Sequence, residues 1–437
     1  MIGCMPFAKM KKFCFLSVLM LICITGCGKT AETGTLKMAV FEHSTIRNQL
    51  VAEYEKKTGI PIEIVEYERY SGEEIDGIDL LRRDIVSGNG PDIIDYGSGF
   101  TMTDVLGQYT VNLSEYLDRE DLHLLDNVVG AFELEGSLPA IPLSFTINTL
   151  IGDKTFFGER STVTIQELME IYEANKADGV MLYVGQFKVD VMGTLLAHNF
   201  SNFIDWNTGI CRFDSEEFKD IIRFANTFPA EFEYPQGIGI GSVYRSEKAM
   251  VLIHGINNVY DIAMTDYVYP DYKGEIIGYP TNGTNGSIIE PGSETLAIPD
   301  TTKKKEQAWD FIRFALEYDN QKLVSDDYGL ALNEDVVNDL IEEYMTPHYN
   351  DSGEMLAVKQ LGYEGEDHTP LYVIDEKQGN EIWKLVNSVD SLGGIDMNLY
   401  QIVFEEVQPF FEGAKNLEEV SDIIQKRISI YVQEKKR

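Results

Sequence analysis

The chain has 437 residues, of which 44% are hydrophobic and 25% are charged, and its formal net charge at pH 7 is −36. This composition excludes a disordered or collagen-like chain, and at roughly 150 residues per domain the length allows two or three folding units. A surface this acidic repels a phosphate backbone, so we expect no nucleic-acid partner.

Residues 1–26 predict an export signal. Lys9, Lys11 and Lys12 precede an apolar run at 13–24 that is shorter than a helix needs to be to cross a bilayer. The run is followed by Thr-Gly-Cys, which resembles a bacterial lipobox and implies that Cys27 is lipidated. The alternatives are a secretory signal cut nearby and an uncut anchor.

Residues 27–34 are then a lipidated cysteine and a short polar tether. Cys211 is the one cysteine of the body, and we expect it to be a small buried apolar residue. No segment after Cys27 has 18 consecutive apolar residues, so we expect no further membrane span.

The body opens with a β-α-β pattern. Apolar strands are predicted at 36–41 and 60–67, with a helix over 47–58 between them that stops at Gly59. A helix over 78–86 and a strand over 92–96 follow. Strands that alternate with helices predict an α/β fold whose parallel sheet carries helices on both faces.

Further along, a strand is expected at 139–151, a helix at 165–174 with Thr164 as its N-cap, and a buried strand at 248–253. The C-terminal third is helix-rich. Its predicted helices are 303–316, 334–344, 381–389, 400–411 and 417–434.

Six segments of the body resemble, in order, the extracellular solute-binding proteins of bacterial ABC importers, in the branch of maltose- and oligosaccharide-binding proteins. They are VAEYEKKTGIPIEIVEY at 51–67, GNGPDIIDYGSG at 88–99, LPAIPLSFTINTLIGDKTFFG at 138–158, EKAMVLIHG at 247–255, LAIPDTTKKKEQAWDFIRFAL at 296–316 and LEEVSDIIQKRISIYVQE at 417–434.

The resemblance implies two α/β lobes with a ligand cleft between them that closes by hinge bending. The N-terminal lobe is expected to comprise 35–143 and about 297–345, and the C-terminal lobe 144–296 and about 346–437. The crossover strands are expected near 143–148 and 295–298.

Candidate ligand residues follow from the loops at the strand ends and from the chemistry of sugar binding. Ligands of parallel α/β sheets bind beyond the carboxyl ends of the strands. Sugar sites combine an aromatic face with carboxylates and amides that bond hydroxyl groups. The predicted ligand residues are Glu42, His43, Tyr96, Ser98, Ser144, Asn148, Tyr244, Asn257 and Asn258.

Each candidate also has an ordinary structural interpretation. Glu42 can be a solvated loop acid, and tyrosines are more often structural anchors than ligand contacts. Similar proteins often carry an aromatic residue where Asn257 and Asn258 stand; Tyr260, Tyr244 or Trp206 are the residues available to replace it. Trp309 lies in a helical apolar stripe and is expected in the core.

The sequence lacks the motifs of the common catalytic and metal sites. It has no GxxxxGK[ST], HExxH or GxSxG motif, and its six histidines show no paired ligand spacing. We therefore expect no catalytic residues, no metal and no cofactor.

The resulting hypothesis is a monomeric, lipid-anchored receptor on the outer face of the cytoplasmic membrane. It would capture a sugar or oligosaccharide and deliver it to an ABC permease. The alternatives are another solute such as a peptide or polyamine, a surface glycan hydrolase, and a sensory partner of a membrane kinase.

Overall fold

The computed structural model describes residues 34–67, 76–97, 105, 107–134, 136–196, 198–206, 208–232, 249–264, 266, 274–281, 285–327, 329–361, 368–393 and 396–435. The predicted export signal and the predicted lipidation site, Cys27, therefore lie outside the described residues. Residues 35–437 form one compact unit.

The first sheet is the β-α-β unit expected from the sequence, extended on one edge. Strands β1 (Leu36–Val40), β2 (Ile62–Glu66) and β3 (Ile93–Asp95) are parallel. Strands β11 (Thr295–Ala297) and β4 (Ile141–Pro142) join antiparallel, and the order is β2-β1-β3-β11-β4.

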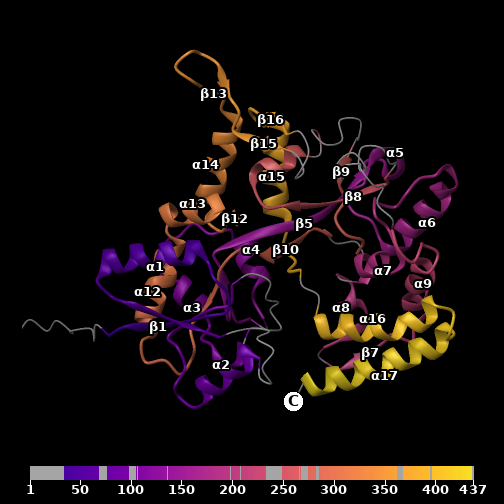
Figure 1. Ribbon diagram of the computed structural model, residues 1–437, viewed down its shortest axis with the longest axis horizontal. Coiled ribbons are helices and arrows are strands. Elements are labelled where there is room, and N and C mark those ends of the chain that lie inside the picture. The colour runs from indigo at the N-terminus through magenta and orange to yellow at the C-terminus, as the bar shows by residue number, and fades with distance from the viewer. Residues whose placement is uncertain are drawn as a thin grey trace, which may run out of the picture. The chain divides into compact units, whose positions relative to one another are not determined.

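Two helices connect the parallel strands. Helix α1 (Thr45–Thr58) is capped by Ser44, and it ends at Gly59, which adopts a left-handed φ of 74°. Helix α2 (Gly77–Val86) leads from β2 to β3. The two connections run in opposite directions across the sheet, so the helices cover opposite faces, as Figure 1 shows.

The second sheet is built around the ten-residue strand β5 (Ser144–Asp153). Its antiparallel partners are β10 (Ile288–Pro291), β12 (Leu330–Ala331), β8 (Val251–Ile256) and β9 (Gly274–Ile276). The placement of β8 differs from the predicted strand at 248–253. Strand β8 extends to Ile256 because its pairing with β5 continues as far as Ile147, the register partner of Ile256.

Strand β5 passes from one hydrophobic cluster to another. Phe145 and Ile147 belong to a cluster built around the first sheet, whereas Leu150 belongs to a second one, which α6, α7, α9, α16 and α17 enclose. The α/β architecture predicted from the sequence is confirmed. The lobe boundaries at about 143 and 297 remain a prediction.

The helices of the C-terminal third lie where the sequence indicates, to within a few residues. Helix α15 begins five residues before its predicted start because Asp375 and Gln378 form a capping box. Thr164 caps α6 in the same way, with Glu167, as expected for the N-cap. Within the described part of the chain, the α-helices after α2 are α3 (Ser114–Leu117), α4 (Asp126–Ala131), α5 (Lys154–Phe157), α6 (Ile165–Asn175), α7 (Lys188–Leu196), α8 (Phe200–Phe203), α9 (Glu216–Ala225), α12 (Lys305–Leu316), α13 (Tyr318–Asp327), α14 (Glu334–Met345), α15 (Glu376–Ser388), α16 (Met397–Phe411) and α17 (Leu417–Lys435).

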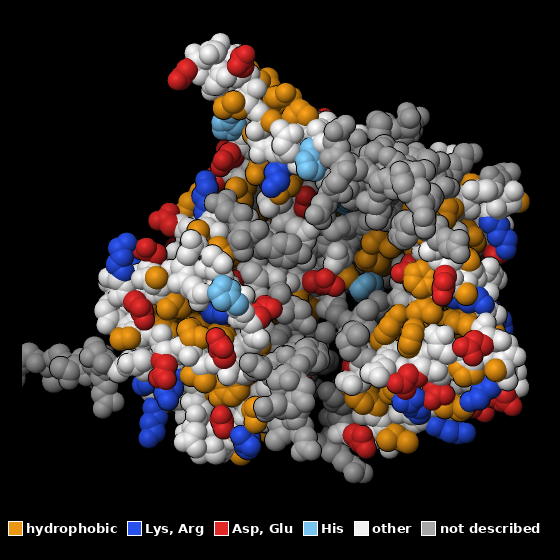
Figure 2. Space-filling model, viewed as in Figure 1, with side chains coloured by type: hydrophobic (Ala, Val, Ile, Leu, Met, Phe, Trp, Pro, Cys, Tyr) orange, Lys and Arg blue, Asp and Glu red, His pale blue; other side chains and the backbone are white. Residues whose placement is uncertain are grey.

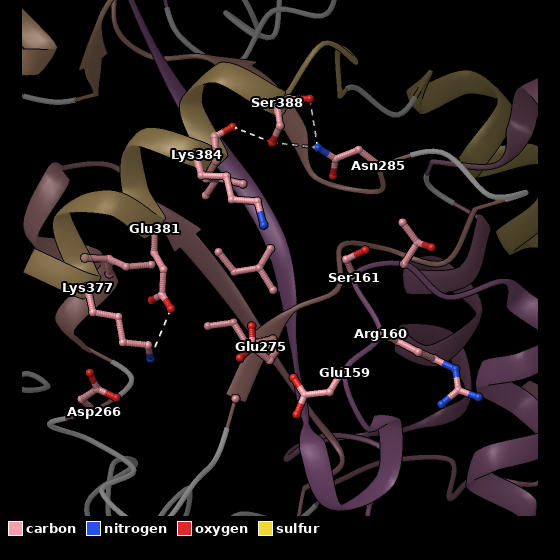
Figure 3. Close-up of a pocket in the computed structure, with 16 residues that line it drawn as sticks. Glu159, Arg160, Ser161, Asp266, Glu275, Asn285, Lys377, Glu381, Lys384 and Ser388 are labelled. Atoms are coloured by element: carbon pink, nitrogen blue, oxygen red, sulfur yellow. Dashed lines mark hydrogen bonds and ion pairs between the residues drawn. The ribbon is translucent and has the colours of Figure 1, made fainter.

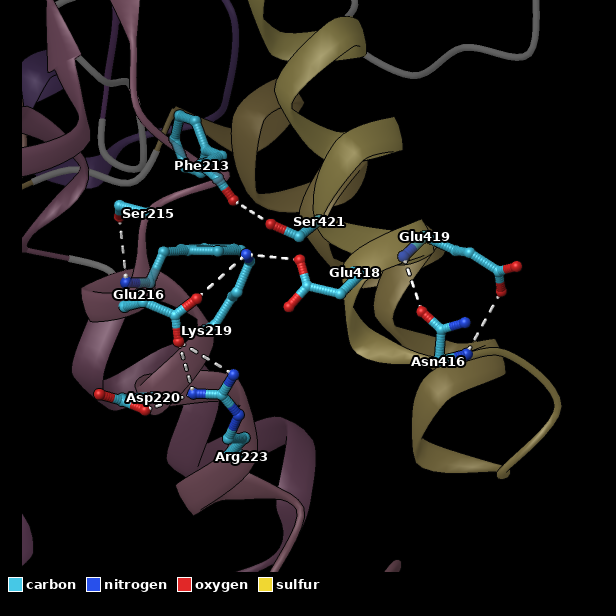
Figure 4. A network of polar contacts seen from close by, with 11 residues as sticks. Phe213, Ser215, Glu216, Lys219, Asp220, Arg223, Asn416, Glu418, Glu419 and Ser421 are labelled. Atoms are coloured by element: carbon cyan, nitrogen blue, oxygen red, sulfur yellow. Dashed lines mark hydrogen bonds and ion pairs between the residues drawn. The ribbon is translucent and has the colours of Figure 1, made fainter.

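The last helix is fastened to α9 by polar contacts (Figure 4). Lys219 of α9 reaches Glu418 of α17 at 2.6 Å and also pairs with Glu216 of its own helix at 3.3 Å. Ser421 donates a hydrogen bond to the carbonyl oxygen of Phe213. These contacts and the apolar stripe of α17 fix the C-terminal helix against the second cluster.

Short hairpins that the sequence analysis did not predict complete the chain. They pair β6 (Ile204–Asp205) with β7 (Ile210–Cys211), β13 (His348–Tyr349) with β14 (Met355–Leu356), and β15 (Lys359–Leu361) with β16 (Thr369–Leu371). The β13–β14 hairpin projects beyond α14 and carries acidic side chains at its tip (Figures 1 and 2). Among the described residues, no helix combines the length and apolar character that crossing a membrane requires.

Candidate functional site

The loops after β1 and β3 leave the same edge of the first sheet. Val40 and Asp95 are register partners, so Glu42 and Gly97 emerge side by side. Gly97 has a φ of 69°, and a Cβ atom there would lie 2.2 Å from the Glu42 Oε1 atom. Glycine is therefore required for the Glu42 carboxylate to rest against this turn. Glu42 and His43 are exposed.

Tyr96 is enclosed rather than presented to solvent. It has no exposed surface, and its ring stacks on Phe41 with centroids 6.1 Å apart and planes 4° apart. A stacking contact of Tyr96 with a solute stays a prediction, and it requires the ring to be uncovered.

A buried charge network connects the loop after β1 to the end of β3. Arg47 Nη1 lies 3.0 Å from Asp95 Oδ2, and Arg47 Nη2 donates to the carbonyl oxygen of Glu42 at 2.7 Å. Ser44 Oγ donates to Glu294 Oε1. Burial, and then the nearby Glu294, raise the pKa of Asp95 to about 7, against the opposing effect of Arg47.

On the second sheet, Asn148 and Glu290 form the start of a polar cluster. Asn148 Nδ2 donates to Glu290 Oε2 at 2.7 Å. Both side chains are half-buried, and burial raises the pKa of Glu290 although the Asn148 bond opposes the shift. A Cβ atom on Gly255 of β8 would lie 3.2 Å from Asn148 Oδ1 and 3.8 Å from Asn257 Nδ2. Two predicted residues, Asn148 and Asn257, therefore converge beside this glycine.

Tyr279 and His198 extend the cluster. Their ring centroids are 4.3 Å apart. Burial lowers the pKa of His198 to about 4, so its imidazole is neutral at pH 7 and offers one donor and one acceptor. Burial, followed by Glu290 and Asp190, raises the pKa of Tyr279 to about 12.

Helix α7, helix α16 and the segment before α7 supply the remaining members, Asp190, Tyr400 and Tyr183 respectively. Tyr183 hydrogen bonds to Asp190, and its hydroxyl lies 3.4 Å from Thr194 Oγ1. Burial raises the pKa of Asp190, and burial and then Asp190 raise the pKa of Tyr400. We call this set the tyrosine–carboxylate cluster; it comprises Asn148, Tyr183, Asp190, His198, Tyr279, Glu290 and Tyr400.

Other predicted residues have structural contacts. Ser144 is fully buried, and its Oγ atom accepts from the backbone N–H of Ser293 at 3.1 Å. The backbone N–H groups of Asn257 and Asn258 donate to Asp261 Oδ2 at 2.8 and 2.9 Å. Ser98 and Tyr244 lie outside the described residues.

The aromatic residues considered as replacements are placed as follows. Tyr260 packs on Tyr344 with ring centroids 5.3 Å apart. Trp206 is 40% exposed at the end of β6. Trp309 is buried in the first cluster, as predicted. Within the described part of the chain, no group of three or more His, Cys, Asp or Glu side chains is placed to hold a metal ion.

Five of the seven cluster members come from segments that carry no motif. Tyr183, Asp190, His198, Tyr279 and Tyr400 are brought together by the fold of the second hydrophobic cluster. Glu290 is the register partner of Thr146, two residues from Asn148 and on the same face of the sheet, a strand pairing for which the sequence analysis offered no signal.

The first sheet with its loop edge and the polar cluster on the second sheet belong to an α/β fold with two main hydrophobic clusters. The match to a family model agrees. Residues 49–346 match the model described as bacterial extracellular solute-binding protein, and the chain belongs to this family. The resemblance inferred from the sequence is thereby confirmed.

Solved structures share the fold at low sequence identity. A periplasmic oligogalacturonide-binding protein from Yersinia enterocolitica has a TM-score of 0.59 at 14% identity, covering 92% of this chain and 100% of its own. An ABC substrate-binding protein from Listeria monocytogenes in complex with cycloalternan has a TM-score of 0.52 at 12% identity, covering 92% and 99%.

A structure described as a de novo designed cysteine esterase also matches, with a TM-score of 0.59 at 14% identity, covering 93% of this chain and 100% of its own. Likeness of fold at this identity therefore does not decide between binding and catalysis. No curated protein matches the chain.

Proposed function

We propose that the protein captures a sugar or oligosaccharide outside the cell and delivers it to an ABC permease. The observation that carries the proposal is the tyrosine–carboxylate cluster. It combines aromatic faces, which pack on the C–H groups of a sugar ring, with polar groups that bond its hydroxyls.

The polar groups of the cluster suit a neutral, hydroxyl-rich solute. Asp190 and Glu290 accept hydrogen bonds, Asn148 both donates and accepts, and neutral His198 does the same. Each sugar hydroxyl is at once a donor and an acceptor, so it can satisfy both kinds of partner. We propose that Glu42 and His43, together with Ser98 and Tyr244, border the same solute.

A cationic solute such as a polyamine is the second candidate, and a specific observation favours it. Within the described residues, no ion pair joins Asp190 or Glu290 to a lysine or arginine, while burial raises the pKa of both carboxyl groups. An ammonium group would supply the missing counter-charge. The two candidates differ in how strongly they depend on the charge of Glu290.

The anchoring and the partner belong to the same proposal. Lipidation of Cys27 after removal of residues 1–26 would hold the protein at the outer face of the membrane as a monomer beside its permease. The Listeria relative, named an ABC substrate-binding protein, supports this role. The absence of the common hydrolase motifs supports capture without turnover.

The experiment is a thermal-shift screen of residues 28–437 against sugars, peptides and polyamines, because a ligand that binds only the folded state raises its stability. The proposal expects a sugar to raise the melting temperature and to be recovered unchanged by chromatography. A polyamine hit alone would favour the second candidate, and accumulation of hydrolysed glycan would contradict a pure receptor.

Two variants refine the result. Glu290→Gln keeps a hydrogen-bonding side chain but removes its charge. For a neutral sugar, the variant should therefore weaken binding by at most about 3 kcal/mol. A polyamine loses more, because the carboxylate would be its counter-ion. The matched control is Glu217→Gln on the exposed side of α9, which removes the same charge outside the cluster.

A further inference from the structure

A cavity lies on the opposite face of β5 from the tyrosine–carboxylate cluster. Ile151 lines this cavity, whereas Asn148 faces the cluster, and residues three apart on a strand point to opposite faces. The cavity has a volume of about 400 Å³, within the usual range of small-molecule pockets. It lies between α15 on one side and β5, β9 and the α5 loop on the other (Figure 3).

The floor of the cavity is apolar. Ile151, Ile276 and Leu385 line it together with Ile262. Such a surface is suited to the hydrocarbon or aromatic body of a ligand, because burying apolar area releases it from water.

The acidic side chains around the cavity are already engaged. Glu159 and Glu275 both pair with Lys154, the former at 3.2 Å. Glu381 pairs with Lys377 at 3.2 Å.

Asp266 is likewise occupied, since its Oδ2 atom accepts a hydrogen bond from Gln378 Nε2 at 2.6 Å. This donor is a neutral amide, so it orients Asp266 without offsetting its charge, whereas Glu159, Glu275 and Glu381 are each paired with a lysine.

The lysine in the middle of α15 is different. Among the described residues, no acidic side chain lies within ion-pair distance of Lys384, and Figure 3 shows its ammonium group directed into the cavity. Arg160 is turned away, because its Nη1 atom donates to the carbonyl oxygen of Phe157 at 2.7 Å. Among the described lining residues, Lys384 is therefore the cationic side chain that has no hydrogen bond or ion pair within the protein.

We propose that this cavity is a second binding site, separate from the solute site, and that it takes a small amphipathic carboxylate. The apolar body lies on Ile151, Ile276 and Leu385, and the carboxylate bonds to the Lys384 ammonium group. Ser161, across the cavity from α15, offers a polar contact to the other end of the ligand.

The test uses three probes that share one apolar body and differ in charge: indole-3-acetate, indole-3-acetamide and tryptamine. Each is titrated into residues 28–437 by isothermal calorimetry. The proposal expects the carboxylate to bind about tenfold more tightly than the amide, as a charge-assisted hydrogen bond in a half-enclosed site provides, and the amine to bind most weakly.

Variants locate the effect. Lys384→Met keeps the length of the side chain without its charge and should lower the affinity for indole-3-acetate to that for the amide. Lys426→Met, on the exposed side of α17, removes the same charge elsewhere and should change nothing.

Equal affinity for the three probes, absence of binding, or an unchanged indole-3-acetate affinity in Lys384→Met would overturn the proposal. The solute screen described above is run on Lys384→Met in parallel. Because that screen reports on the opposite face of β5, the two proposals can fail independently.

Discussion

The buried carboxyl group of Asp95 makes the stability of the protein depend on pH in a defined direction. Burial and the neighbouring Glu294 raise its pKa from the ordinary 3.8 to about 7. Between these values the folded state holds a proton that the unfolded chain has lost. The free energy of unfolding therefore falls as pH rises through this window, by an amount on the order of 4 kcal/mol for the whole shift.

Glu294→Gln isolates one part of this effect. Glu294 is the second cause after burial, so removing its charge should remove part of the pH dependence, on the order of 1–2 kcal/mol. The variant leaves one buried ion pair between Arg47 and Asp95, and Gln keeps an oxygen that accepts from Ser44. We compare the free energy of unfolding of the variant with that of wild type at each pH. The difference, variant minus wild type, should be larger at pH 7.5 than at pH 4.5 by that amount.

The assay is urea unfolding followed by tryptophan fluorescence at several pH values between 4.5 and 7.5. Glu63→Gln, on the exposed side of β2, removes one charge from the same sheet and controls for the large net negative charge. A stability difference between Glu294→Gln and wild type that does not change with pH would refute the reasoning.

Three further predictions use other parts of the fold. Gly97→Ala should destabilise the protein more than Gly59→Ala. Both substitutions place a Cβ atom at a positive φ, which costs about 1–2 kcal/mol, but only at Gly97 would that atom also clash with the Glu42 carboxylate. Equal urea-unfolding midpoints of the two variants would contradict this. Phe213→Ala should cost about 3–5 kcal/mol in urea unfolding, because the ring is fully buried against Phe203 and Phe218; a loss below about 1 kcal/mol would count against a tight aromatic core. Cys27→Ser should move the protein from the membrane fraction to the soluble fraction, and continued tight anchorage would argue against lipidation.

The architecture could be read from the sequence where local signals agree with the final packing. The first β-α-β unit has apolar strands, a helix with Ser44 at its start and Gly59 at its end, and short connections, so each element was placed to within a few residues. The β8 strand was displaced because its end depends on pairing with β5, a contact between residues about a hundred positions apart.

The site was harder to predict for the same reason. Asn148 was predicted because it lies on an expected crossover strand, and Asn257 because it follows a buried strand; both remain predictions as ligand residues. Tyr183, His198 and Tyr400 come from helices or turns whose local pattern indicates only structure, and long-range packing alone brings them together. Ionisable groups such as Glu290 acquire their distinctive pKa from burial, which a single sequence does not reveal.

The most direct test of the central claim is a crystal structure of residues 28–437 with the solute that the screen identifies. The account predicts density for that solute in contact with Asn148, Glu290 and the Tyr279 ring. Density placed away from the tyrosine–carboxylate cluster, with these side chains still in contact only with one another, would contradict it.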